Sequence, residues 1–254
     1  MAISVAQIWR FPVKSMRGER IDEGPLVESG LQGDRRFGVV DDETGKVLSA
    51  KREARLLLAS ARLVGDGVEI DLPDGTTVSS ADSDVDARLS AWLDRSVSLR
   101  RASADVQTVY EMNTDNTDES SPLFDFPCPP GTFLDAAAVH LLTTASLRAA
   151  AAEYPEGDWD VRRFRPTVLL ECDGDDWVED GWVGGPVTVG EAGLMVFAPT
   201  VRCAVPTRAQ DGLPRDLGIA KTVNRAHQSN LGVYAAVASP GTVRIGDRVT
   251  LSSA

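Results

Sequence analysis

Short apolar runs closed by glycine- or proline-containing turns dominate the sequence and constrain its fold most. Residues 56–64, 68–72 and 76–79 are three such runs, and the turns at 65–67 (Gly-Asp-Gly) and 73–75 (Pro-Asp-Gly) separate them. Runs of this length between such turns predict a meander of antiparallel strands. We therefore expect a mostly β fold with a few helices, of the α+β class.

Further strands are predicted along the whole chain, with few helices between them. Residues 37–41 and 46–50 flank a turn that ends in Gly45, which predicts a hairpin. The other predicted strands cover 3–9, 96–101, 167–172, 187–189, 194–198, 232–238, 242–245 and 248–252. Apolar spacing predicts a helix over 85–93, a Thr143-Thr144 cap starts another that runs to about 153, and 219–230 is either a helix or a long loop.

A change of composition divides the chain of 254 residues into two parts. The segment 111–132 is rich in Asp, Asn, Ser, Thr and Pro and has no hydrophobic period, which is typical of a loop or linker. We therefore expect a smaller β-rich N-terminal domain over 1–110 and a second domain over 133–254. An open alternative is that the first strand of the N-terminal domain packs with the second domain.

Charge and composition exclude several classes of function. The formal net charge of −12 argues against a nucleic-acid partner or an anionic membrane surface. No apolar stretch reaches the length of a transmembrane helix, and the N-terminus is interpreted as a strand, not a signal peptide. Three widely spaced cysteines predict neither a disulfide framework nor a CxxC metal site, so a reducing cytoplasm is the expected compartment.

Cys203 is the one cysteine whose surroundings indicate chemistry. It follows a predicted strand, lies between Pro199 and Pro206, and comes directly after Arg202. A neighbouring cation favours the thiolate, which is the form that acts as nucleophile or metal ligand. The alternative is that Cys203 is a small buried apolar residue.

The remaining cysteines and both histidines are expected to be structural. Cys172 ends an apolar strand and is predicted to lie in the core, and Cys128 has no identifiable charge partner. His140 is interpreted as a partly buried structural residue and His227 as a solvated surface residue. No His spacing typical of a metal pair occurs.

Three basic clusters stand at the ends of predicted strands, where binding loops commonly lie. They are Lys14-Ser15, Asp34-Arg35-Arg36 and the arginines at 162, 163 and 165. Each alone is compatible with a solvated turn, but together they suit an anionic ligand with phosphate oxygens. Neither a Walker A sequence nor a GxGxxG sequence is present, so nucleotide binding of those types is excluded.

Six motifs in order make the chain resemble the MOSC family. They are Phe-Pro-Val-Lys-Ser from position 11, Gly-Leu-Gln-Gly-Asp-Arg from 30, Arg-Phe-Arg-Pro from 163, Thr-Val-Arg-Cys from 200, Leu-Gly-Val-Tyr from 231 and the closing Pro-Gly-Thr-Val-Arg-Ile-Gly-Asp-Arg-Val. The resemblance spans the whole chain and is greatest to the amidoxime-reducing members found in mitochondria and bacteria. It implies a β-barrel MOSC domain packed with an N-terminal MOSC-associated domain.

The resemblance also implies a molybdenum cofactor (Mo-molybdopterin) and residues that hold it. Cys203 occupies the position of the cysteine that ligates the metal, and so is the implied catalytic and metal-binding residue. The implied cofactor-binding residues are Lys14, Ser15, Arg35, Ser146, Arg165, Thr167, Arg202, Cys203 and Tyr234. Thr167 departs from the family, whose closest relatives carry Asn there, which puts that pterin contact in doubt.

The activity implied by the resemblance is reduction of N-hydroxylated or N-oxide substrates. The chain lacks haem, flavin and iron–sulfur motifs, so its electrons are expected from a separate donor protein of one of those types. Two alternatives stay open: a non-catalytic carrier of the cofactor, and a sulfur-delivery protein in cofactor maturation.

Overall fold

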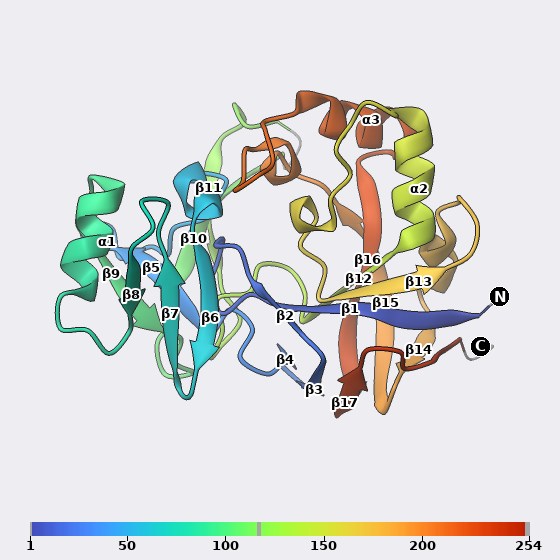
Figure 1. Ribbon diagram of the computed structural model, residues 1–254, viewed down its shortest axis with the longest axis horizontal. Coiled ribbons are helices and arrows are strands. Elements are labelled where there is room, and N and C mark those ends of the chain that lie inside the picture. The colour runs from blue at the N-terminus through green and yellow to red at the C-terminus, as the bar shows by residue number, and fades with distance from the viewer. Residues whose placement is uncertain (1, 116–117, 252–254) are drawn as a thin grey trace.

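The computed structural model describes residues 2–115 and 118–251 and is mostly β (Figure 1). Its largest element is a curled eight-stranded sheet in the order β18-β14-β15-β16-β12-β13-β1-β2. The pairing of β12 with β13 is parallel, and every other pairing in this sheet is antiparallel. The strands of this sheet are Ile3–Arg10 (β1), Glu19–Ile21 (β2), Val139–Thr143 (β12), Val168–Cys172 (β13), Pro186–Val189 (β14), Ala192–Val201 (β15), Asn230–Ser239 (β16) and Val249–Leu251 (β18).

The first strand of the chain belongs to this C-terminal sheet. β1 pairs with β13 and β2, and Ser4 also forms an isolated bridge with Arg248 just before β18. The Val5 N–H in β1 donates to the Asp247 carbonyl at 2.9 Å, so β1 approaches β18 at the opposite edge of the sheet. The sheet thus curls into a nearly closed barrel around a core of aliphatic side chains.

A second unit lies beside the barrel and has its own hydrophobic core (Figure 1). It contains the pair β5–β9 and the meander β6–β7–β8, covered by helix α1 (Val85–Leu93). Its strands are Phe37–Asp41 (β5), Ser60–Val64 (β6), Gly67–Asp71 (β7), Thr77–Ser79 (β8) and Val97–Arg101 (β9). A small three-stranded sheet of Glu23–Val27 (β3), Gly30–Leu31 (β4) and Gly241–Arg244 (β17) joins an N-terminal segment to one near the C-terminus.

The helices form where the sequence provides caps and apolar spacing. Helix α1 buries Val85, Leu89 and Leu93, one residue every four, as predicted. Helix α2 (Thr144–Glu153) begins at Thr143, whose side chain accepts the Ser146 N–H at 3.0 Å. Helix α3 (Leu217–His227) settles the open choice in favour of a helix for 219–227, while the chain turns at 228–229 and Asn230 begins β16.

Two predicted strands differ in the structure. β5 pairs along its length with β9, while the predicted hairpin with 46–50 is reduced to one bridge between Val40 and Val47, because the chain turns at 50–52. The first part of the predicted strand 56–64 is a 3-10 helix, Ala54–Leu58, in which two consecutive leucines are buried. A helical turn allows both leucines to be buried on one side of the chain, whereas a strand with one exposed face would expose one of them.

The segment 111–132, expected to be a loop or linker, contains most of a hairpin. β10 (Val109–Asn113) pairs with β11 (Leu123–Pro127), and the Asn113 amide donates to the carbonyls of Glu119 and Ser121 to close the connection. The side chains of β11 are mostly exposed, so its composition resembles that of a loop. Residues 116 and 117 of this segment lie outside the described residues.

A search of the described residues for a helix long and apolar enough to cross a membrane finds none.

Candidate functional site

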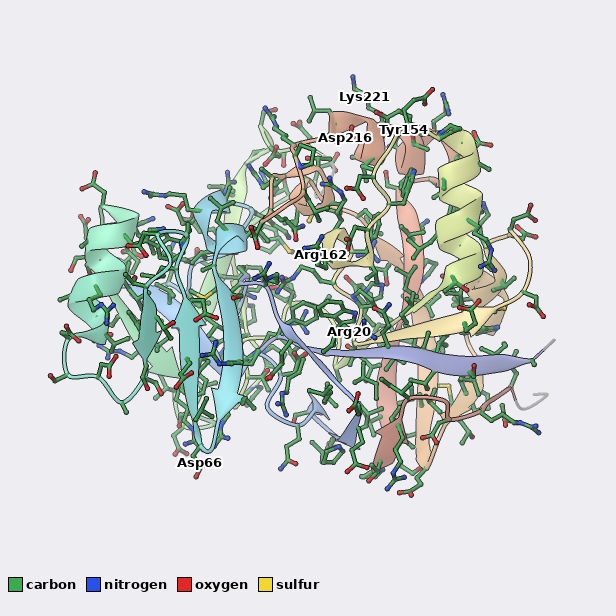
Figure 2. All side chains as sticks on the ribbon, viewed as in Figure 1. Arg20, Asp66, Tyr154, Arg162, Asp216 and Lys221 are labelled. Carbon is green, nitrogen blue, oxygen red and sulfur yellow. The ribbon has the colours of Figure 1, made fainter. Side chains whose placement is uncertain are left out.

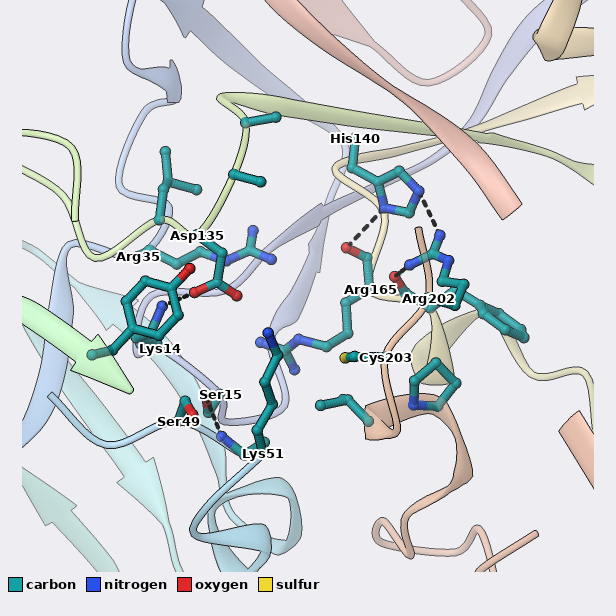
Figure 3. A pocket seen from close by; sticks show the side chains of 18 of the residues that line it. Lys14, Ser15, Arg35, Ser49, Lys51, Asp135, His140, Arg165, Arg202 and Cys203 are labelled. Atoms are coloured by element: carbon teal, nitrogen blue, oxygen red, sulfur yellow. Dashed lines mark hydrogen bonds and ion pairs between the residues drawn. The ribbon is translucent and has the colours of Figure 1, made fainter. Parts of the chain in front are cut away.

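A pocket opens between the two units, at the ends of strands that each unit contributes (Figure 3). Eight of the nine residues implied as cofactor-binding line it, namely Lys14, Ser15, Arg35, Arg165, Thr167, Arg202, Cys203 and Tyr234. They come from segments up to 220 positions apart in the sequence. The fold therefore brings together side chains that the sequence could only propose one motif at a time.

The backbone is strained at three of these positions. Ser15, Arg35 and Arg165 have φ values of 70°, 47° and 53°, in the left-handed region that disfavours residues other than glycine. The other described non-glycine residues with positive φ, Asp94, Gln228 and Ser229, lie at or just after the ends of helices α1 and α3. Strain of this kind concentrates at functional sites, because the surrounding structure must hold it in place.

The lining of the pocket is strongly cationic although the chain is acidic. Among the described lining residues the cationic side chains outnumber the carboxylates, of which Asp135 is the single example; the cations are Lys14, Arg35, Lys51, Arg163, Arg165 and Arg202. Burial, together with the charge of Arg35, lowers the pKa of Arg165 to about 9. The pocket is therefore electrostatically incomplete without an anion.

Lys14 is held by the one acidic residue of the lining. Its ammonium is buried, donates to the Phe133 carbonyl at 2.8 Å, pairs with the Asp135 carboxylate and lies 4.3 Å from the centre of the Tyr110 ring. Burial acts to raise the pKa of Asp135, but the charges of Lys14 and Lys51 lower it overall. Asp135 thus supplies part of the negative charge that the cations need.

Arg202 is oriented by backbone carbonyls and by His140 (Figure 3). Its guanidinium donates to the carbonyls of Leu231 at 2.9 Å and Phe164 at 3.0 Å, and it lies 2.7 Å from His140 Nε2. An arginine only donates, so Nε2 is the acceptor of a neutral imidazole. Burial and the Arg202 charge agree with this, since they hold the pKa of His140 well below its usual range.

Gly232 makes this contact possible. Its φ is +82°, and a Cβ there would lie 2.5 Å from His140 Nε2 and 2.6 Å from the Leu141 carbonyl oxygen. Only glycine fits between these groups.

Cys203 stands where two cavities meet. Besides the cationic pocket, it lines a second cavity of about 770 Å³ that shares only Arg202 and Cys203 with the first. Helix α3 forms one wall of the second cavity with Leu217, Lys221 and neighbouring residues, and Figure 2 shows Lys221 on the outer side of that helix. The thiol can therefore be approached from two sides.

Arg163 fixes the chain that follows Cys203. It is fully buried and donates to the carbonyls of Asp158, Pro206, Arg208 and Pro214 at 2.8 to 3.4 Å. The turn after the thiol is thereby tied to the 3-10 helix Val161–Arg163 in front of β13.

Thr167 and Tyr234 line the pocket by different means. The Thr167 hydroxyl accepts the His140 backbone N–H at 3.1 Å, so this departure from the family pattern links β12 to the residue in front of β13. The Tyr234 ring packs edge-on against His140 and stacks on Phe197. Burial raises the pKa of the Tyr234 hydroxyl, which keeps it a hydrogen-bond donor.

Ser146 is the implied residue that the structure does not bring to the pocket. Its hydroxyl donates to the buried Glu179 carboxylate at 2.6 Å, and the Thr143 hydroxyl donates to the same group at 2.7 Å. Burial raises the pKa of Glu179. The start of α2 is thus occupied by a carboxylate of this chain.

Several lining residues are outside the predicted set, among them Ser49, Lys51, Tyr110 and Asp135. Sequence reasoning also misplaced His227, which lies between Asp180 and the Asn230 carbonyl and stacks on Trp177 at 4.2 Å, so it is not a solvated residue. Cys172 is buried in the barrel core, as predicted.

Comparison with known proteins agrees with this architecture. The model of the MOSC N-terminal beta barrel domain matches residues 2–118, and the model of the MOSC domain matches residues 130–250. Mitochondrial amidoxime-reducing component 1 of Homo sapiens is 24% identical over 287 residues, which cover 98% of this chain and 82% of that protein. The protein of the same name from Mus musculus is equally similar, at 24% over 286 residues.

A solved structure has the same fold. The YUAD protein from Bacillus subtilis superposes with a TM-score of 0.51 and 12% identity, covering 98% of this chain and 94% of its own. With both domain models matched in order over nearly its whole length, the chain belongs to the MOSC family.

Proposed function

We propose that this protein is a molybdenum-cofactor-dependent reductase of N-hydroxylated or N-oxide substrates. One observation carries the proposal: a thiol, Cys203, stands between a cation-lined pocket and a second open cavity. The first cavity suits an anionic cofactor and the second suits a substrate. The names of the relatives, amidoxime-reducing components, support the same choice of reaction.

The residues present fit the cofactor in charge and in donor type. A thiolate is a suitable ligand for a metal bound by sulfur. The cations Lys14, Arg35 and Arg165 suit a phosphate and a polar ring system, and Arg165 has no carboxylate within ion-pair distance among the described residues. We propose that Cys203 ligates the metal and that these cations hold the rest of the group.

The cofactor, held at the Cys203 thiol, would supply two-electron redox chemistry. The balanced reaction is N–OH + 2e⁻ + 2H⁺ → N–H + H₂O, in which the N–O bond breaks and oxygen leaves as water. Both electrons come from a separate donor protein with a flavin, haem or iron–sulfur centre.

The chain's own contribution is positioning. Arg202, which precedes Cys203 in the sequence, is held by His140 and the Leu231 carbonyl. Arg163 holds the backbone that follows Cys203 by donating to the Pro206 carbonyl. The small N-oxygenated substrate approaches from the second cavity, which has the size of ordinary small-molecule sites. A cavity on that side favours an enzyme over a carrier, which needs no second approach to the metal.

The test uses protein made in a host that synthesises the cofactor. Molybdenum and pterin content are measured first, and then reduction of an amidoxime by a chemical reductant. We expect wild type to contain molybdenum and to turn over, and Cys203→Ser to lose both. Cys172→Ala, which removes a core thiol far from the pocket lining, is the control and should retain the metal.

Two results contradict the reductase. Metal and pterin that bind without turnover of any N-hydroxylated substrate would indicate the carrier. Equal behaviour of Cys203→Ser and wild type would remove the thiol from the site altogether.

A further inference from the structure

The Ser49 side chain has no hydrogen-bond partner although it is buried. Ser49 is 6% exposed, its Oγ is buried, and it lines the cationic pocket. A buried hydroxyl without a partner costs free energy, so such groups are rare and point to a ligand when they line a cavity. None of the sequence motifs included this residue.

Ser15 stands beside Ser49 and has a hydroxyl hydrogen to offer (Figure 3). Its Oγ accepts the Ala50 N–H at 2.8 Å, which uses an acceptor position and leaves the O–H free to donate. Its backbone is left-handed, with φ of 70°, and its side chain lines the pocket. Two hydroxyl donors of the N-terminal unit thus face the same part of the pocket.

Lys51 adds a cation to the two hydroxyls. Its side chain reaches into the pocket toward Arg165 in Figure 3, and its charge is among those that lower the pKa of Asp135. The Lys51 carbonyl accepts a hydrogen bond from Arg208 at 2.9 Å. Because Arg208 belongs to the barrel unit, the turn that carries Ser49 and Lys51 is fixed from across the pocket.

Two hydroxyl donors and a cation opposite an arginine match one ligand chemistry, a phosphate group. Hydroxyls and ammonium groups donate to its oxygens, and a guanidinium pairs with two of them at once. We infer that Ser49 and Lys51, together with Ser15, bind a phosphate group whose other side is held by Arg165. This inference rests on the proposed function in one respect: we assign the phosphate to the molybdenum cofactor.

A first experiment tests the phosphate site without cofactor or turnover. Cofactor-free protein is unfolded thermally over a series of inorganic phosphate concentrations at constant ionic strength. Phosphate should raise the Tm of wild type, because a ligand of the folded state stabilises it. Ser49→Ala and Lys51→Gln should each weaken phosphate binding by about tenfold, the usual loss for a hydrogen bond to a charged group.

Matched variants keep this test decisive. Ser49→Thr retains the hydroxyl and should restore binding, which separates loss of the donor from a folding defect. Ser60→Ala and Lys46→Gln alter the same unit outside the pocket and should bind phosphate like wild type. A Tm that phosphate leaves unchanged, or raises equally in wild type and Ser49→Ala, overturns the site.

A second experiment distinguishes free phosphate from the cofactor. Loaded wild type and Ser49→Ala are compared for the rate at which they lose pterin, measured by the fluorescence of the oxidised pterin. Faster loss from Ser49→Ala supports the assignment to the cofactor. Equal rates, with phosphate binding intact in the first experiment, overturn that assignment; neither readout depends on reductase activity.

Discussion

The two walls of the pocket hold their cations in different ways. On the barrel wall, Arg163 and Arg202 donate to backbone carbonyls. On the N-terminal wall, Lys14 donates to the Phe133 carbonyl but also pairs with the side chain of Asp135, and Arg35 pairs with that of Asp34. Carbonyls are fixed by the fold, whereas the half-exposed Asp135 carboxylate can titrate and rotate. The barrel wall is therefore a preformed scaffold, and on the N-terminal wall Lys14 has a partner that a ligand can replace.

The largest expected effect comes from removing a guanidinium of the barrel wall. Arg163→Met leaves several buried carbonyls without a donor and should lower the free energy of unfolding by about 3–5 kcal/mol. Chemical denaturation measures this. The neighbouring Arg162, which pairs with Asp160 near the surface, is the control (Figure 2), and Arg162→Met should cost less than about 1 kcal/mol. Similar losses of stability in both variants would contradict the conclusion that the barrel wall is a preformed scaffold.

The next effect tests how tightly the barrel wall is packed. Gly232→Ala places a methyl group against His140 and should cost about 2–4 kcal/mol. Gly246→Ala is matched, since its φ of +87° is almost the same but no atom lies within 4 Å of the added Cβ. Gly246→Ala should lower the free energy of unfolding only by the cost of a left-handed backbone at a non-glycine residue, about 1–2 kcal/mol. If the two variants unfold alike, crowding at His140 is absent.

A smaller effect is expected on how the stability of the protein depends on pH. The pKa of His140 lies well below its usual value of 6.5 when folded, because of burial and then Arg202. Below about pH 6.5 the unfolded chain therefore binds a proton at His140, whereas the folded protein does not. The free energy of unfolding falls as the pH drops below this value, by up to about 1.4 kcal/mol per pH unit. Denaturation midpoints across pH 7 to 4 should show a shallower fall for His140→Gln. His227→Gln leaves His140 intact and should retain the wild-type fall.

The smallest effect is expected on the N-terminal wall. Asp135 has a lowered pKa, so its pair with Lys14 stabilises the protein above the usual value of 3.8 and is lost as the pH falls below it. The Asp135 side chain is half exposed, so solvent screens the pair and Asp135→Asn should cost less than about 1 kcal/mol. The same variant should bind inorganic phosphate more tightly, because a competing anion is gone. Weaker phosphate binding would show that this wall is as fixed as the other.

Local sequence patterns predicted much of the fold, and eight of the residues implied by the family resemblance line one pocket. Helix α1 follows directly from its apolar spacing, and the start of α2 from the Thr143 cap. The partner of β5 could not be predicted, since β9 lies more than fifty residues away and a nearer apolar run with a turn competed for it. Ser146 was misplaced because a helix start that suits an anion does not show which anion takes it, here Glu179.

Ser49 carries no sequence signal of its own. A serine that ends an apolar run is common, and only its covered, unpartnered hydroxyl distinguishes it. His227 was misjudged for a similar reason, since the aromatic ring that stacks on it lies fifty residues earlier in the chain.

The place of β1 in the barrel governs the order in which the molecule can assemble. Lys14 and Ser15 lie in the turn after a strand whose main partner, β13, begins only at Val168. During synthesis the edge of β1 that pairs with β13 therefore stays unpaired until about two-thirds of the chain has been made. Pairing over such a separation is slow and leaves the waiting edge open to other strands. The N-terminal unit made alone would keep that edge exposed and aggregate, whereas both halves supplied together would restore the pocket.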